Sequence, residues 1–209
     1  MKKLLLGLVV LLAMAGGVLT LSPTTLLATV QFAERQLAGL TLKNQTVGDL
    51  TYSYYDGGPQ DAPAIVMIHG FGANKDNWLR FARPLTAQYR VIALDLPGFG
   101  DSSKPATLSY DVASQSERVL ALLDALKISK FHVIGNSMGG HISALLAARH
   151  PERVLSAALL DIAGVEAPNK SEFCRRIEQG EANPLVVSKP EDFQRLLDFV
   201  FVEAPPMPT

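Results

Sequence analysis

The sequence has few of the residues that would support a disulfide, a zinc site or a nucleic-acid surface. Its 209 residues include one cysteine, Cys174, which excludes an intramolecular disulfide and leaves too few thiolates for zinc. Positive charge is not in excess either, because 19 Lys and Arg face 20 Asp and Glu, a net charge of −1. Proteins that bind nucleic acid normally carry a basic stripe or tail, so we expect no such partner.

Phosphate-binding and metal-binding patterns are also missing. No stretch of the sequence has the G-x-x-x-x-G-K spacing of a phosphate loop, and no residue cluster suggests a metal. We therefore expect neither a metal nor another cofactor. Hydrophobic residues make up 48% of the chain and charged residues 19%, which predicts a folded protein with a sizeable core. The length favours a single domain with an extra segment.

The longest hydrophobic run stands at the N-terminus. Lys2 and Lys3 precede the uncharged residues 4–21, which as a helix would span roughly 27 Å. We interpret residues 1–22 as a signal peptide or signal anchor and favour an uncleaved anchor, although Ala13-Met14-Ala15 is a possible cleavage site. The lysines favour the cytoplasmic side. Both alternatives therefore predict an exported chain that is membrane-anchored, periplasmic or secreted.

Short apolar segments then alternate with helical patterns. The periodicity predicts a connecting helix over residues 23–40. The expected strands are 41–43, 50–55, 64–68, 91–94, 131–134 and 154–160. The expected helices between them are 76–85, 111–126 and 138–150. Because continuous apolar strands are normally covered on both faces, this alternation predicts a three-layer α/β core with a mostly parallel sheet over residues 41–165.

The character of the chain changes after Gly164, where charged helical stretches and prolines follow. The segment Ser188-Lys189-Pro190-Glu191 predicts a capping box with proline at the first helical position. An amphipathic helix with an apolar stripe from Phe193 to Phe201 should follow it. Cys174 lies in a charged helical stretch, residues 172–178, and we interpret it as incidental.

The strongest chemical signal is Gly135-Asn136-Ser137-Met138-Gly139-Gly140, between an expected strand and an expected helix. A G-x-S-x-G turn at such a junction holds serine in a strained, exposed conformation. Ser137 is therefore a candidate nucleophile. The alternative is an ordinary glycine-rich turn between a strand and a helix.

A serine nucleophile also needs hydrogen-bond donors aimed at the oxyanion of its tetrahedral intermediate. The candidates are two backbone N–H groups, that of Met138 at the start of its helix and that of Phe71 in the loop His69-Gly70-Phe71-Gly72. We interpret His69 as a structural residue that ties this loop to the sheet. The loop formed by residues 95–102, Asp-Leu-Pro-Gly-Phe-Gly-Asp-Ser, is interpreted as scaffold.

These three segments, in this order, resemble the α/β-hydrolase superfamily over roughly residues 41–209. Residues 69–78 and 135–140 look most like extracytoplasmic lipases and monoacylglycerol lipases with an N-terminal anchor. The resemblance implies a serine hydrolase that cleaves carboxylic esters, with an acyl ester or acylglycerol substrate. Two alternatives stay open: a carbon–carbon bond hydrolase of the same fold, and an inactive truncated pseudoenzyme. Ser137 argues against epoxide hydrolases and haloalkane dehalogenases, which carry aspartate there.

The resemblance further implies a triad in the order serine, acid, histidine. His141 lies one turn along the helix from Ser137, and His150 lies about 20 Å along it, so neither is placed to act as the base. His132 precedes the serine on its own strand. Asp161 is the positional candidate for the acid, although the usual position is one strand later.

We therefore expect an incomplete α/β-hydrolase fold. Strands 7 and 8, the usual acid and the histidine would lie beyond Thr209, and residues 166–209 would form the start of a helical cap. Such a sheet should expose an unpaired edge and apolar surface. We expect the chain by itself to be poorly stable and nearly inactive.

Overall fold

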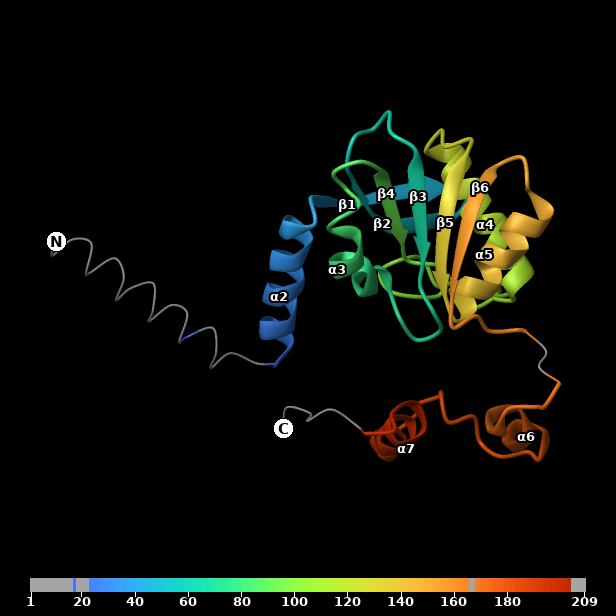
Figure 1. Ribbon diagram of the computed structural model, residues 1–209. Coiled ribbons are helices and arrows are strands. Elements are labelled where there is room, and N and C mark those ends of the chain that lie inside the picture. The colour runs from blue at the N-terminus through green and yellow to red at the C-terminus, as the bar shows by residue number, and fades with distance from the viewer. Residues whose placement is uncertain (1–16, 18–22, 166–167, 204–209) are drawn as a thin grey trace, which may run out of the picture. The chain divides into compact units, whose positions relative to one another are not determined.

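The structure is a computed structural model that describes residues 17, 23–165 and 168–203 (Figure 1). Apart from Gly17, the expected signal segment lies outside these residues. Within the part that is described, no helix is both long and apolar enough to cross a membrane. The chain divides into two compact units, residues 1–163 and residues 164–209.

A six-stranded sheet forms the centre of the first unit. Its strands are β1 (Leu40–Val47), β2 (Leu50–Gly57), β3 (Ala64–Ile68), β4 (Arg90–Leu94), β5 (Phe131–Asn136) and β6 (Val154–Leu160). They lie in the order β1-β2-β4-β3-β5-β6, in which β4, β3, β5 and β6 run parallel to one another and β2 is antiparallel to both of its neighbours, β1 and β4. The mostly parallel sheet is confirmed. β1 runs beyond the expected 41–43 because its polar residues continue the ladder with β2 as far as Val47.

Helices cover the two faces of this sheet (Figure 1). The covering helices are the 3-10 turn η1 (Lys75–Trp78), α3 (Leu79–Ala82), α4 (Val112–Ala125) and α5 (Met138–Arg149), whereas α2 (Pro23–Leu37) precedes β1 and has no buried residue. Side chains of α4 and α5 form one buried cluster with Val66 and Ile68 of β3. Those of η1 and α3 form another with Ile65 and Met67. β3 therefore alternates between two cores, as the three-layer prediction requires.

The helix expected over residues 76–85 is shorter and split. A 3-10 turn leads into a single α-helical turn that ends at Ala82. Pro84 follows two residues later and has no N–H to continue the helical hydrogen bonds. The sequence pattern extended past this proline because Leu85 continues the apolar periodicity.

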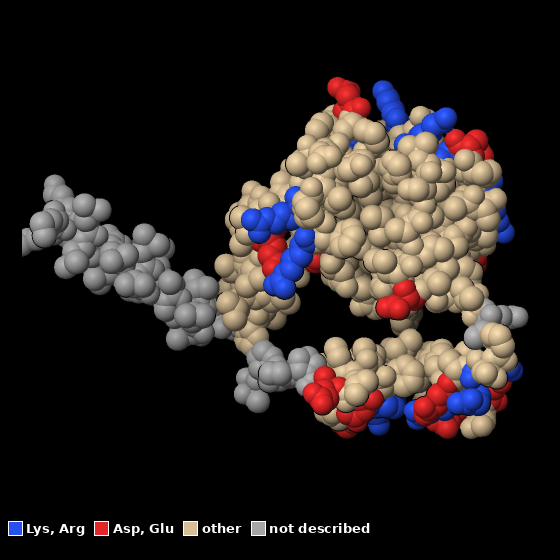
Figure 2. All heavy atoms as spheres, viewed as in Figure 1, with Lys and Arg blue, Asp and Glu red and all other residues tan. Residues whose placement is uncertain are grey.

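β6 differs from the strand covered on both faces that the sequence predicted. It lies at the edge of the sheet and pairs with β5. Leu155, Leu159 and Leu160 are 50%, 41% and 38% exposed. Charged side chains lie mainly near the margins of the visible face of this unit (Figure 2). The expected exposed edge with apolar surface is present here.

The second unit contains two short helices, α6 (Glu172–Glu178) and α7 (Pro190–Val200). Proline opens α7 as predicted, but the capping carboxylate is Asp192 rather than Glu191. Its Oδ2 accepts hydrogen bonds from the backbone N–H groups of Ser188 and Lys189, at 3.0 and 3.2 Å. The N-cap residue is Lys189, and Asp192, three residues later, reaches these N–H groups, whereas Glu191 does not. The assignment of this unit to a cap stays a prediction.

Candidate active site

Ser137 forms the sharp turn between β5 and α5. Its backbone torsions are φ 51° and ψ −115°, a region of backbone conformation that residues other than glycine rarely adopt. Such a conformation costs on the order of 1–3 kcal/mol and persists where neighbouring contacts fix it. The side chain is half-buried, as expected for a reactive group that a ligand must reach.

The glycines around Ser137 let α5 approach the sheet. A Cβ atom at Gly135 would collide with the carbonyl oxygen of Gly139 and with the Ser143 hydroxyl. One at Gly139 would collide with the carbonyl oxygen of Ile68, at the end of β3. Both positions therefore require glycine because backbone atoms lie where a side chain would begin.

The loop after β3 lies beside this turn. A Cβ atom at Gly70 would stand 3.3 Å from Cβ of Ser137, so the two segments nearly touch. The backbone N–H of Phe71 donates no hydrogen bond within the described residues. Met138 opens α5, so its N–H has no carbonyl of its own helix to bond and lies at the positive end of the helix dipole. The structure thus brings the loop of Phe71 to Ser137 and Met138.

His69 links two loops and is almost fully buried. Its Nδ1 lies 2.8 Å from the carbonyl oxygen of Gly70, and Nε2 accepts a 3.1 Å hydrogen bond from the N–H of Leu96. These partners assign the proton to Nδ1. Burial lowers the pKa of His69, so the ring is neutral at pH 7. The interpretation of His69 as a structural residue agrees with this geometry.

A buried ion cluster next to His69 was not predicted from the sequence. The carboxylate of Asp95 accepts hydrogen bonds from the backbone N–H and Nζ of Lys75, both at 2.7 Å. It also accepts one from the N–H of Asp101 at 2.8 Å. The sequence signal was a lysine in an otherwise uncharged loop, together with an aspartate directly after a buried strand.

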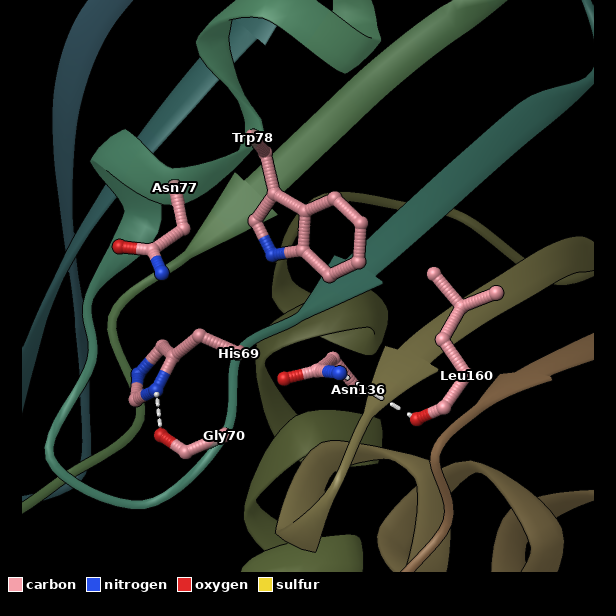
Figure 3. A pocket seen from close by; sticks show the side chains of 6 residues that line it. All are labelled: His69, Gly70, Asn77, Trp78, Asn136 and Leu160. Carbon is pink, nitrogen blue, oxygen red and sulfur yellow. Dashed lines mark hydrogen bonds between the residues drawn. The ribbon is translucent and has the colours of Figure 1, made fainter. Parts of the chain in front are cut away.

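A cavity of about 160 Å³ adjoins the turn (Figure 3). It is lined by His69, Gly70, Asn77, Trp78, Asn136 and Leu160. The Nε1–H of Trp78 is buried and has no hydrogen-bond partner among the described residues. Figure 3 shows this nitrogen facing the side of the cavity where His69 and Asn136 lie. Because no carboxylate or ammonium group lines the cavity, it suits neutral groups.

The remaining candidates have no side-chain hydrogen bond to the Ser137 hydroxyl among the described residues. Asp161 directly follows β6, is exposed, and has a φ of 44°. Nδ1 of His132 lies 2.8 Å from the Ser156 hydroxyl, and His150 is the C-cap residue after α5. None of these side chains, nor that of His141, is hydrogen-bonded to Ser137 in the described structure. Asp161 as the triad acid therefore stays a prediction.

Comparisons with known proteins agree with this architecture. The sequence model described as alpha/beta hydrolase fold matches residues 63–198. Lipase 1 of Psychrobacter immobilis is 40% identical over 180 residues, 84% of this chain and 55% of the relative. Monoacylglycerol lipase abhd6-B of Xenopus laevis is 31% identical over 195 residues, 88% of this chain and 58% of the relative.

A solved structure covers the whole chain. The crystal structure of a membrane phospholipase A, described as a bacterial virulence factor, is 60% identical with a TM-score of 0.83. The match covers 100% of this chain and 67% of that one. This chain thus spans little more than half the length of the two lipases above. The matching family model and the six-stranded sheet with its serine turn lead to one conclusion: the chain belongs to the alpha/beta hydrolase fold family.

Proposed function

We propose that this chain carries the nucleophile and the oxyanion-binding groups of a serine hydrolase that cleaves lipid carboxylic esters. The observation that carries the proposal is the strained Ser137 at the β5–α5 junction, with Gly70 packed against it. Strain at such a turn is found where function requires an exposed reactive group. The similar lipases and the phospholipase support lipid esters as the substrate class.

In the proposed reaction, the Ser137 oxygen attacks the ester carbonyl carbon. The carbonyl oxygen takes up negative charge, which the N–H groups of Phe71 and Met138 stabilise. The intermediate collapses to an acyl-serine, and the alcohol leaves with the proton that Ser137 gave to a general base. Water then hydrolyses the acyl-serine and restores the hydroxyl.

None of the four histidines of this chain is placed to act as the general base for Ser137. His69 is buried with both ring nitrogens in contact with backbone groups. The side chains of the other three have no hydrogen bond to Ser137 among the described residues. We therefore propose that a histidine outside these 209 residues takes the proton, as the resemblance to the family implies.

The same proposal includes attachment to a membrane through residues 4–21. Two lysines followed by an uncharged apolar run favour an anchor with the hydrolase unit outside the cytoplasm. The similar protein described as a membrane phospholipase A supports attachment to a membrane. A hydrolase held at a bilayer would meet its lipid substrate where that substrate is concentrated.

A fluorophosphonate probe tests the proposal because it reacts only with an activated serine. The complete gene product is purified and treated with the probe, and hydrolysis of a monoacylglycerol is measured beside it. We expect labelling at Ser137 and turnover, and loss of both in Ser137→Ala. Ser114→Ala, in the first turn of α4, serves as the matched control and should keep both. Absence of labelling would favour the pseudoenzyme alternative, and turnover that survives Ser137→Ala would contradict the proposed nucleophile.

A further inference from the structure

Lys75 is almost completely buried, which is rare for a lysine. Its side chain is 3% exposed, and Nζ lies 2.7 Å from a carboxylate oxygen of the fully buried Asp95. A second carboxylate oxygen, from Asp101, lies 2.7 Å away. Burial would lower the pKa of Lys75, but hydrogen bonds and charges from Asp101 and Asp95 outweigh it and raise the pKa, so the ammonium stays charged.

Such a pair is an inefficient source of stability. Removing two charges from water has a large free-energy cost, and apolar side chains of similar volume often stabilise a protein as well or better. Net stability therefore does not explain the cluster of Lys75, Asp95 and Asp101, and we ask instead which part of the chain the cluster holds in place.

What the cluster holds is one end of the loop that carries Phe71. Besides the Nζ contact, the backbone N–H of Lys75 donates to Asp95 Oδ1 at 2.7 Å. At the other end of the loop, the His69 ring accepts a hydrogen bond from the N–H of Leu96 at 3.1 Å. Both ends of the 69–75 segment are therefore fastened to Asp95 and Leu96, two successive residues directly after β4.

The segment after β4 also contacts the middle of that loop. The Phe99 ring lies edge-on to the rings of His69 and Phe71, with centroids 5.3 and 5.9 Å apart. Gly100 has a φ of 48°, and a Cβ atom there would collide with the Asp95 carboxylate. This glycine lets the chain wrap around the carboxylate so that the N–H of Asp101 can reach it.

We propose that Lys75 is a positioning residue that, through Asp95, holds the backbone N–H of Phe71 in the direction of the oxyanion at Ser137. The inference rests on the proposed function, because it requires an oxyanion to form there. Donors of this kind act by being fixed before charge develops. A loop fastened at both ends meets that requirement, whereas a loop fastened only at His69 would let Phe71 move.

The matched pair of variants is Lys75→Met and Arg90→Met. Arg90 opens β4 and pairs at 3.0 Å with the buried Asp56, so it forms a second buried ion pair at the opposite end of the same strand. Both variants should lower Tm in the complete gene product. We expect Lys75→Met to lower kcat on a monoacylglycerol by about 10-fold or more, part of the roughly 100- to 1000-fold that loss of one oxyanion donor costs. KM should stay within about 3-fold, as expected when only the transition state loses an interaction.

Arg90→Met is expected to keep kcat within about 3-fold of the wild type despite its lower Tm. The double variant Lys75→Met/Asp95→Asn removes the unpaired buried carboxylate, so its Tm should exceed that of Lys75→Met while kcat stays low. If the single variant does not fold, the double variant decides the question. A wild-type kcat in Lys75→Met, or a kcat that recovers with Tm in the double variant, would overturn the inference. Turnover that persists in Ser137→Ala contradicts the proposed function instead.

Discussion

The backbone N–H of Ser137 donates a 2.9 Å hydrogen bond to the carbonyl oxygen of Leu160, the last residue of β6. The carbonyl oxygen of Ser137 in turn accepts a 3.0 Å hydrogen bond from the N–H of Ala163. The strained turn is therefore held by the last residue of β6 and by the segment that follows it. Each such bond contributes about 0.5–1.5 kcal/mol, which offsets much of the strain.

Gly135→Ala tests how closely the turn is packed. The new methyl group would meet the carbonyl oxygen of Gly139 and the Ser143 hydroxyl, so β5 and α5 must separate. We expect a loss of about 1–3 kcal/mol in the free energy of unfolding, measured by urea denaturation. Fluorophosphonate labelling of Ser137 should fall as well, because the serine moves with α5.

Gly48→Ala is the control for this prediction. Gly48 lies in the turn between β1 and β2 with a φ of 57°, and a Cβ atom there meets nothing within 4 Å. Backbone strain alone should cost about 1 kcal/mol, with labelling of Ser137 unchanged. Equal loss of labelling in the two variants would show that general destabilisation, rather than the turn, controls the serine.

The serine turn could be predicted because its determinants are local. A strand, a G-x-S-x-G segment and a helix follow one another within a few residues, and the two glycines mark close approaches. The contacts of Ser137 with Leu160 and Ala163 were not predictable in the same way, since they depend on the register between β5 and β6. The partner of Lys75 was missed for the same reason: Asp95 is 20 residues away in sequence.

The buried His69 predicts that stability falls in mild acid. Burial holds the pKa of His69 below its usual value of about 6.5, although Asp95 nearby opposes the shift. The unfolded chain therefore takes up a proton that the folded chain does not, and stability decreases as pH falls below about 6.5. The contribution of this residue is limited to about 1.4 kcal/mol per pH unit.

Replacement of the ring isolates this contribution. The free energy of unfolding of the wild type, His69→Gln and His150→Gln is measured between about pH 7.5 and 5. His69→Gln should be less stable at neutral pH and show a smaller decrease in acid. His150→Gln, which follows α5, is measured beside it as a histidine replacement outside the buried cluster. An unchanged slope in His69→Gln would show that this histidine titrates alike in the folded and unfolded chain.

Asp56→Asn tests the ion pair at the far end of the sheet. The buried carboxylate of Asp56 lies 2.8 Å from Lys43 Nζ and 3.0 Å from Arg90 Nη2. Burial would raise its pKa, but hydrogen bonds from Arg90 and Lys43 outweigh this and lower it. The contribution of the ionised Asp56 to stability is therefore complete above about pH 3.9, the pKa of an aspartate in the unfolded chain. It is lost as pH falls through the lower pKa that Asp56 has in the folded protein.

We expect Asp56→Asn to cost about 3 kcal/mol at pH 7, the low end for a broken buried pair because Lys43 is partly exposed. Asp49→Asn, at an exposed position of the β1–β2 turn, should change stability by less than about 0.5 kcal/mol. Both variants should keep fluorophosphonate labelling, since Asp56 pairs with Arg90 at the start of β4, whereas Ser137 follows the end of the parallel strand β5. A selective loss of labelling in Asp56→Asn would contradict this separation of stability from the site.

Sequence reasoning was least successful where burial depends on neighbours in space. The apolar run 154–160 predicted a strand covered on both faces, whereas β6 is an edge strand with exposed leucines. An apolar run shows that a strand is suited to apolar contacts on both faces, but it does not show which elements pack against those faces. The helix predicted over 76–85 was too long, because the apolar periodicity continues past Pro84 although the helix ends before this proline.

The single cysteine allows a test of the proposed anchor. Cys174 is exposed, so a thiol reagent that cannot cross a bilayer reports the side of the membrane on which the second unit lies. In spheroplasts we expect Cys174 to be labelled without lysis and the protein to sediment with the membrane. Deletion of residues 1–22 removes the apolar run and should leave a soluble chain that is labelled only after lysis. Cys174→Ser gives the background, and labelling of the wild type only after lysis would contradict export, because the lysines would then have failed to orient the chain.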